Sequence, residues 1–420
     1  MKSPGMILQV FPSIIKEIEG DLFIDVDWAD ALKLYTENFD KVVFACPIST
    51  ITQDNPDSGL KNCRPINQLP QWASKLEVLP LPYAYKFHRF IYHKSSVRKI
   101  LRDYIRKASY LEFSPSSLIG DWATLASTEA IKMKRPYVIS GDIVYPERMR
   151  FSIQDQSKWK RYIKEYSSIK PFEKKYSTIL KNAGLAFFQG QDVYDEYSPL
   201  PKVSHQIYHV TMTKEERISS SQLEHQITEL KQGRALKICY AGRAGALKGP
   251  LDWIYALDAA IKSGVNLEAT WIGDGSLLAE MQSLAQKLNI TEHIQFTGFV
   301  SERKKLLKIL SESDIFLFCH KTRESPRCLL EALGSGCALI GYEGVYPEGL
   351  VKTYGGGLFT PINDWEGLSQ LLVNMNSDRI QLSQLIQNAY RSGELHDRDT
   401  AYMNRINLIK QFYSEGLDLT

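Results

Sequence analysis

The unit that most restricts the fold spans residues 315–344, where two apolar runs enclose a polar loop and a short helical segment. Ile315–Phe318 leads into the loop, and Cys337–Ile340 follows the helical segment after the Gly334–Gly336 break. Strands that alternate with helices form parallel sheets covered on both faces. We therefore expect two parallel strands here, with the loop at the carboxyl end of the first.

The helix in this unit offers an anion site at its start. Ser325 is a good N-cap residue and Pro326 suits the first helical position, so we expect the helix to begin there. Its first amides would face the loop, and helix N-termini attract anions. Two carboxylates, Glu324 and Glu331, flank this start. A phosphate site beside carboxylates that can bind hydroxyl groups suits a nucleotide-sugar.

The same alternation continues along the 420 residues, a length that suits two domains. In the first half, apolar runs predict strands at 6–11, 41–46, 76–80, 109–113, 137–140 and 185–188, and helical periodicity predicts helices at 28–37 and 118–133. Long loops at 12–28 and 48–72 are expected at strand ends. They either shape an acceptor pocket or form surface connections. The stretch 191–204, with Pro199 and Pro201, is typical of an interdomain linker.

Composition indicates a soluble globular protein, with 44% apolar and 24% charged residues. The net charge of +3 is too small to argue for nucleic acid. The six cysteines show no metal-ligand spacing, and several lie in apolar runs, so we expect buried thiols in a reducing compartment. We find no evident signal peptide and no apolar run long enough to span a bilayer. We therefore expect a cytoplasmic protein.

Two segments of the first half are both basic and aromatic, residues 85–107 and 158–181. In the first, Val97, Leu101 and Ile105 share one helical face and cations occupy the others. Such a helix either lies on an anionic membrane or covers a sheet with its apolar face and leaves a solvated basic face. The second segment adds weight to the first alternative. It would place the protein peripherally at the inner face of the membrane, where a lipid-linked acceptor is available.

The second half opens with a strand and a glycine-containing loop at residues 235–250. The loop carries Arg243 and Lys248 and leads into a helix at 251–262. A strand, a glycine loop and cations before a helix make a diphosphate site plausible. Neither the Walker A order nor the dinucleotide fingerprint occurs here. Taken alone, the two cations would be ordinary surface charges.

From residue 235 to 375 the chain resembles the retaining glycosyltransferases of family 4. The matching segments, in the family's order, are Ala241–Gly249, Ile272–Gly275, Phe296–Gly298, Glu324–Leu333 and Gly357–Pro361. The resemblance implies the GT-B architecture, an α/β fold of two Rossmann-like domains facing across a cleft. It implies an acceptor-binding domain at 1–200, a nucleotide-sugar donor-binding domain at 201–398, and a C-terminal helix at 399–420 that packs back on the first domain.

The resemblance also implies roles for individual residues. Arg243 and Lys248 would clamp the donor diphosphate, Glu331 would hold the ribose hydroxyls, and Glu324 would contact the sugar ring near the anomeric carbon. The remaining donor contacts would come from Gly242, Gly273, Phe296, Gly298, Phe299, Ser325, Pro326, Arg327 and Cys328. No cofactor and no metal is implied, because cationic side chains and the helix start take the place of a metal.

The sequence departs from the family pattern at two places. The family has seven residues between its two glutamates, whereas Glu324 and Glu331 enclose six, and Arg323 occupies the position of the first glutamate. Either Glu324 still reaches the sugar or the site has changed its chemistry. A histidine that many relatives carry in the first domain is also missing, and Ser116, Asp121 and Asp142 are the candidates to fill its space.

Three functions remain open from the sequence. The first is transfer of a sugar from a nucleotide diphosphate sugar to a saccharide or lipid-linked acceptor with retention, in surface polysaccharide or glycolipid biosynthesis. The second is a degenerate GT-B protein that binds a glycan or partner without turnover. The third is another GT-B enzyme, such as a phosphorylase or an epimerase. The nucleotide, the sugar and the acceptor are not determined by the sequence.

Overall fold

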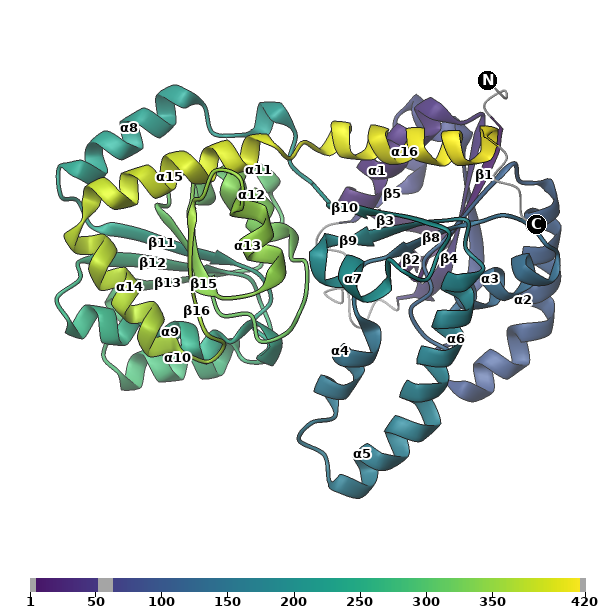
Figure 1. The fold of residues 1–420 in the computed structure, drawn as a ribbon, viewed down its shortest axis with the longest axis horizontal. Coiled ribbons are helices and arrows are strands. Elements are labelled where there is room, and N and C mark those ends of the chain that lie inside the picture. The colour runs from purple at the N-terminus through teal and green to yellow at the C-terminus, as the bar shows by residue number, and fades with distance from the viewer. Residues whose placement is uncertain (1–4, 52–62, 416–420) are drawn as a thin grey trace. The chain divides into compact units, whose positions relative to one another are not determined.

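The computed structural model describes residues 5–51 and 63–415, which divide into two compact units. The first unit runs to Ile207 and takes in the chain from Ala401, and the second comprises Tyr208–Thr400. Each unit holds a sheet with helices on both faces (Figure 1). The predicted α/β class with two parallel-sheet domains is therefore confirmed. The units divide after Ile207 and after Thr400, whereas the sequence placed the boundaries at 200/201 and 398/399.

The sheet of the first unit is mainly parallel. Its strand order is β10-β9-β8-β7-β1-β4-β2-β3-β5, and β6 also pairs with β4. Neighbouring residues of β1, such as Ile7 and Leu8, are fully buried in cores on opposite faces. The strands are β1 (Met6–Val10), β2 (Ile15–Ile18), β3 (Asp21–Asp25), β4 (Lys41–Thr50), β5 (Cys63–Pro65), β6 (Leu76–Pro82), β7 (Tyr110–Phe113), β8 (Val138–Gly141), β9 (Leu185–Gln189) and β10 (Val203–Ile207).

Both long loops expected in this unit contain strands, so that part of the prediction is wrong. β2 and β3 form an antiparallel hairpin within 12–28. Its turn residues, Glu19 and Gly20, both have positive φ, as hairpin turns of two residues require. β5 pairs with β3 at the end of the second loop. These strands are short and half-polar, so they lack the apolar run that marks a buried strand. Residues 52–62 of the second loop lie outside the described residues.

The stretch 191–204 is not a linker, which corrects a second expectation. It forms α7 (Gly190–Tyr197) and the start of β10, and β10 pairs in parallel with β9. Pro199 and Pro201 lie between these two elements, where no ladder hydrogen bond needs their missing N–H groups. The two prolines therefore mark a turn inside the unit and not its end.

Helices cover both faces of the first sheet. One face carries α2 (Phe87–Lys107), α3 (Trp122–Lys132) and α6 (Lys170–Lys181), and the other carries α1 (Val26–Asn38) and α16 (Arg398–Ser414). Val97, Leu101 and Ile105 of α2 are buried against the sheet. The second half of α2 therefore matches the sheet-covering alternative. Two further helices, α4 (Tyr145–Ser152) and α5 (Lys158–Lys164), project from this unit (Figure 1).

A buried ion pair ties α16 to the first sheet. Glu112 on β7 is fully buried and accepts hydrogen bonds from Gln9 Nε2 and Ser140 Oγ, both at 2.8 Å. Arg405 of α16 donates to the same carboxylate through Nε, at 3.1 Å, and through Nη2. A buried carboxylate needs such partners, because burial without them is costly.

The second unit contains six parallel strands in the order β13-β12-β11-β14-β15-β16. They are β11 (Leu236–Ala241), β12 (Leu267–Ile272), β13 (Ile294–Gly298), β14 (Ile315–Phe318), β15 (Ala338–Tyr342) and β16 (Gly357–Thr360). β11 comes first in the chain and lies between β12 and β14. The strand order therefore reverses direction between β11 and β14.

Eight helices of the described chain surround this second sheet. They are α8 (Ser220–Lys231), α9 (Pro250–Lys262), α10 (Leu278–Lys287), α11 (Arg303–Ser311), α12 (Arg327–Gly334), α13 (Val345–Val351), α14 (Trp365–Ser377) and α15 (Arg379–Glu394). Within the described residues, no helix of either unit is long and apolar enough to cross a bilayer.

Candidate functional site

The two loops singled out in the sequence meet where the strand order of the second sheet reverses. One loop follows β11 and the other follows β14, and the Lys321 amide donates to the Leu247 carbonyl oxygen across them at 2.9 Å. In open α/β sheets, ligands bind beyond the carboxyl ends of the strands at this point. Gly249 permits the close approach. It has φ of +57°, and a Cβ there would overlap the Cys319 carbonyl oxygen.

Lys248 and Glu324 form an ion pair between these loops, with Nζ and Oε1 2.6 Å apart. His320 Nδ1 lies 3.7 Å from the same Glu324 oxygen, and His320 Nε2 is 2.9 Å from the Tyr240 hydroxyl. Both side chains of the ion pair are largely shielded from solvent. By contrast, Arg323 is exposed. The structure thus places Glu324 beside Lys248, one of the two cations predicted to bind the donor diphosphate.

His320 was not predicted as a site residue. Burial, and then the charge of Lys248, holds its pKa well below the usual value, so the imidazole is neutral. A neutral imidazole can donate from one nitrogen and accept at the other. The only signal in the sequence was its place in the loop after β14, directly before the predicted polar residues.

Glu331 belongs to a second group of paired side chains. Its Oε1 accepts hydrogen bonds from Thr211 Oγ1 at 2.7 Å and from Arg303 Nη1 at 2.9 Å. Arg303 also binds both oxygens of Glu216, at 2.6 and 3.0 Å. One oxygen of Glu331 is thereby occupied, which holds the carboxylate in one orientation. Thr211, Glu216 and Arg303 were missed in the sequence because each lies far from Glu331 along the chain.

Helix α12 begins later than predicted. Its N-cap is Pro326, not Ser325, and its first residue is Arg327. Pro326 has ψ of 128°, which is extended and not helical, so it cannot be the first helical residue. Cys328 lies in the first turn, and burial raises the pKa of its thiol to about 12. Although the helix starts later than predicted, the backbone amides of its first turn still come directly after the loop that carries Glu324.

The other predicted donor-binding residues lie on loops at the same edge of the sheet. Arg243 is exposed, on the loop that also carries Gly242 and Lys248. Backbone hydrogen bonds link this loop to the next two, from Gly242 N to Ile272 O and from Gly273 N to Gly298 O, each 2.9 Å long. Phe296 and Gly298 end β13, and the exposed Phe299 follows them.

Asp121 and Asp142, two of the residues proposed to fill the space of the missing histidine, have different surroundings in the first unit. Asp121 is buried as the N-cap of α3, where it accepts from the amides of Ser116 and Ser117 and from that of Ala123 at 2.8 Å. Its lone pairs serve the fold, which argues against a role in catalysis. Asp142 accepts a hydrogen bond from the Tyr145 hydroxyl at 2.7 Å. In the described parts of the chain, no group of three His, Cys, Asp or Glu side chains could hold a metal ion.

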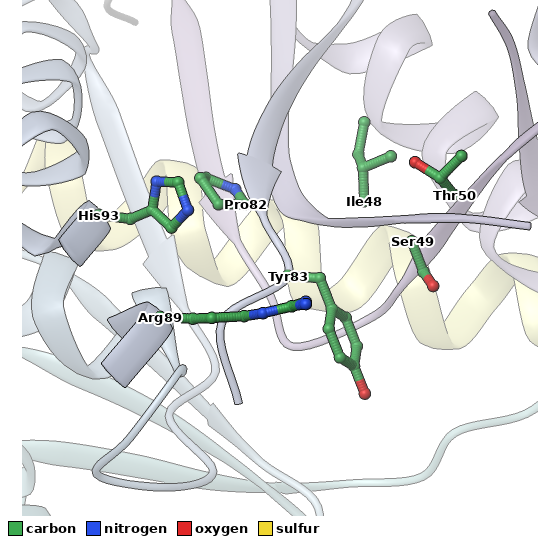
Figure 2. A pocket seen from close by; sticks show the side chains of 7 residues that line it. All are labelled: Ile48, Ser49, Thr50, Pro82, Tyr83, Arg89 and His93. Carbon is green, nitrogen blue, oxygen red and sulfur yellow. The ribbon is translucent and has the colours of Figure 1, made fainter. Parts of the chain in front are cut away.

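Two pockets lie in the first unit, near the carboxyl ends of its strands. The first has a volume of about 360 Å³ and is lined by Arg89 and His93 of α2, by Tyr83, and by Ser49 and Thr50 at the end of β4; the Arg89 side chain points towards Tyr83 (Figure 2). The second, of about 400 Å³, combines apolar side chains with serines and Lys164. Both offer polar groups that could bind a saccharide or an anion.

Comparison with known proteins connects this geometry to a family. Residues 221–392 match the model of the glycosyl transferases group 1 family. The second unit is therefore similar to the group 1 glycosyltransferases. The match includes the loop that follows β11, the loop that follows β14 and the whole of α12. It confirms the family resemblance inferred from the sequence, although the match does not extend to the first unit.

Solved structures extend the likeness to both units and show that the chain has the GT-B fold. HepE of Anabaena in complex with UDP has 13% identity and a TM-score of 0.66, covering 97% of this chain and 99% of its own. Sucrose-phosphate synthase of Thermosynechococcus elongatus has 12% identity and a TM-score of 0.66, with coverage of 98% and 100%. WaaG, a glycosyltransferase involved in lipopolysaccharide biosynthesis, has 13% identity and a TM-score of 0.64, with coverage of 96% and 99%. No curated protein sequence matches the chain.

Proposed function

We propose that this chain transfers a sugar from a nucleotide diphosphate sugar to a saccharide or lipid-linked acceptor, with retention of configuration. The observation that carries the proposal is the ion pair of Lys248 and Glu324 at the reversal point of a domain similar to the group 1 glycosyltransferases. UDP-sugars are the first donors to test, because HepE was solved with UDP and with UDP-glucose. Surface polysaccharide or glycolipid is the proposed product class.

The ion pair suggests how the donor enters. Glu324 neutralises Lys248, with Oε1 and Nζ 2.6 Å apart. A bound diphosphate would compete for Lys248, with Arg243 as a second cation, and would free Glu324 to contact the sugar ring. Cations aimed at the diphosphate also stabilise the charge that develops on the leaving nucleotide. The shortened spacing to Glu331 is thus compatible with Glu324 in the role of the first glutamate.

The rest of the donor site follows from the loops at this edge. The free oxygen of Glu331 would accept from the ribose hydroxyls, since Thr211 and Arg303 occupy the other. Amides at the start of α12, from Ser325 to Cys328, would cradle a phosphate. The backbone from Phe296 to Phe299 would contact the base.

We propose front-side attack through an ion-pair-like transition state for the transfer itself. The acceptor hydroxyl attacks the anomeric carbon on the face that the diphosphate leaves, and the leaving phosphate takes the hydroxyl proton. This step requires no strong protein base, which fits the absence of a histidine from residues 114–121 and 140–143, the runs comparable to those in which many relatives carry one. The acceptor would bind the first unit, whose two pockets supply hydroxyl and cationic groups.

Nucleotide-sugar binding and UDP release together test the proposal. We expect UDP-sugars to raise the melting temperature of the protein, because a ligand of the native state stabilises it. Lys248→Ala should abolish this shift, whereas Glu324→Gln should keep donor binding and lower UDP release by about a hundredfold, as expected for loss of an interaction made in the transition state. Lys262→Ala, an exposed lysine on α9, serves as the control.

Two results would contradict sugar transfer. If no nucleotide-sugar shifts the melting temperature, the donor assignment is wrong. If UDP-sugars bind but no saccharide or lipid-linked acceptor supports UDP release, the protein is the degenerate binder considered above.

A further inference from the structure

Helix α5 and the residues after it form an arm that projects from the first unit (Figure 1). The chain is helical from Lys158 to Lys181 through α5, a π-helical segment at Glu165–Ile169, and α6. Phe172, Tyr176 and Ile179 of α6 are buried in the core, whereas α5 has no buried residue. One end of this helix is therefore anchored in the core, and the other end is unsupported.

The unsupported end carries a continuous stripe of aromatic side chains. Trp159 is 69% exposed and stacks on Tyr162 with ring centroids 6.1 Å apart. Tyr162 in turn contacts Tyr166 at 4.6 Å, and Ile163 lies on the same end. Spacings of three and four residues place these side chains on one helical face. A contiguous exposed group of apolar side chains, unlike a single one, marks a site of interaction with a protein or a membrane.

The charge of the arm is strongly positive. Residues 158–181 contain eight lysines or arginines and two glutamates. Both glutamates are already paired, because Arg150 on the neighbouring α4 binds Glu165 at 2.6 Å and Glu173 at 2.8 Å. Lys158, Lys160, Arg161 and Lys164 of α5 form no ion pair within the described chain. The aromatic stripe is therefore bordered by cations that have no acidic partner.

A second exposed aromatic group lies close to the arm, at the start of α2. Phe87 is 64% exposed and Tyr92 is 82% exposed. The start of α2 and the arm belong to the same end of the first unit (Figure 1). Lys94 lies near enough to Lys175 on α6 to contribute, after burial and Lys132, to the lowered pKa of Lys175. The two groups together form one aromatic and basic surface.

We propose that this surface, α5 with the start of α2, docks the protein on the face of an anionic lipid bilayer. Trp and Tyr partition to the boundary between headgroups and acyl chains, while lysine and arginine bind anionic headgroups. An acidic protein partner would satisfy the cations, but it would not explain aromatic side chains at the tip of a projecting helix. Docking of this kind does not depend on donor binding, because the second unit contributes no residue to the surface.

Vesicle binding by the full chain tests the proposal. We expect sedimentation with vesicles of phosphatidylcholine mixed with phosphatidylglycerol and little with phosphatidylcholine alone. Binding should weaken as salt screens the charges. Lys160→Glu with Arg161→Glu should lower the partition coefficient by more than about tenfold, since each cation near an anionic surface contributes substantially. Trp159→Ser with Tyr162→Ser should lower it by a similar factor.

Matched controls distinguish docking through this surface from nonspecific adsorption to lipid. Ile380→Ser removes an apolar side chain of α15 that is 76% exposed, and Lys287→Glu reverses an exposed charge on α10. Neither should change vesicle binding. Brominated lipid should also quench the fluorescence of Trp159, and Trp159→Phe should remove that quenching while binding remains.

Two results would overturn the proposal. The first is equal vesicle binding by the wild type and the two α5 double variants. The second is no vesicle binding together with a concentration-dependent dimer that the Trp159→Ser, Tyr162→Ser variant loses, which would make the surface a contact between two copies of the chain.

Discussion

Arg303 shows how a residue outside the predicted set can control a predicted one. Its guanidinium binds Glu216 through two nitrogens and Glu331 through a third, at 2.9 Å. An arginine fork of this kind fixes the plane of a carboxylate. We therefore infer that Arg303 positions Glu331 for the donor ribose and does not itself touch the reacting atoms.

Substitution of Arg303 should affect donor binding more than turnover. We expect Arg303→Gln to raise the KM for the nucleotide-sugar about tenfold, a loss of about 1.4 kcal/mol, with kcat little changed. Steady-state kinetics with varied donor measures both constants. Arg303→Lys should restore part of the affinity, and Arg391→Gln on α15 should behave as the wild type. A fall in kcat with an unchanged KM would argue against a positioning role.

Among the elements, the loop after β11 depends on one glycine. Gly249 has a left-handed φ, and its Cβ would overlap the Cys319 carbonyl oxygen of the loop after β14. We expect Gly249→Ala to lower the free energy of unfolding by about 2 kcal/mol, through backbone strain and displacement of the second loop. Denaturant unfolding gives this value, and UDP-sugar titration should show weaker binding.

Gly245 in the same loop is the matched control for Gly249. Its φ is −133°, and no atom lies within 4 Å of a Cβ built there. Gly245→Ala should therefore change the free energy of unfolding by no more than about 0.5 kcal/mol. Equal effects of the two substitutions would show that the close approach at Gly249 is unimportant.

We expect the ion pair of Arg405 with Glu112 to contribute much of the free energy that holds helix α16 on the first sheet. Arg405→Met leaves the Glu112 carboxylate buried without its cation, and we expect a loss of about 3–5 kcal/mol in the free energy of unfolding. Glu112→Gln combined with Arg405→Met should lose less than the sum of the two single changes. Arg106→Met removes an exposed ion pair with Asp103 and should cost less than about 1 kcal/mol. If Arg405→Met were as mild as Arg106→Met, the buried pair would not anchor the helix.

For the whole molecule, acidification should destabilise the second unit first. Burial, and then the charge of Arg217, lowers the pKa of His396 to about 4. The unfolded chain has an ordinary histidine pKa of about 6.5, so it binds a proton first as the pH falls. The free energy of unfolding should therefore decrease from about pH 6.5 down to pH 4, by up to about 3 kcal/mol for this residue. His320, whose pKa is also lowered, acts in the same direction.

Calorimetry across this pH range checks the prediction. His396→Gln should flatten the dependence of the second unit's melting temperature on pH, whereas His225→Gln, at an exposed position on α8, should not. An unchanged dependence in His396→Gln would contradict the assignment.

Several features of the whole molecule were predictable from the sequence. Parallel strands buried on both faces require continuous apolar runs, and those runs stand out at β1, β7, β9 and β14. The loops that carry Lys248 and Glu324 could be located because each follows such a run. The sequence also indicated that these two loops lie on the same side of the sheet, because the carboxyl ends of parallel strands share one edge of a sheet.

Other features depend on the path of the chain in space. The hairpin of β2 and β3 has no apolar run, because most of its side chains are only half-buried. Thr211 and Glu331 lie 120 residues apart, and no local pattern could pair them. The sequence alone thus determined the alternation of strands and helices and the chemistry of the loops, since both depend on neighbouring residues. The tertiary structure determined which charges meet, that Glu324 reaches Lys248 and that Arg303 holds Glu331, because side-chain pairing depends on distances that no sequence spacing records.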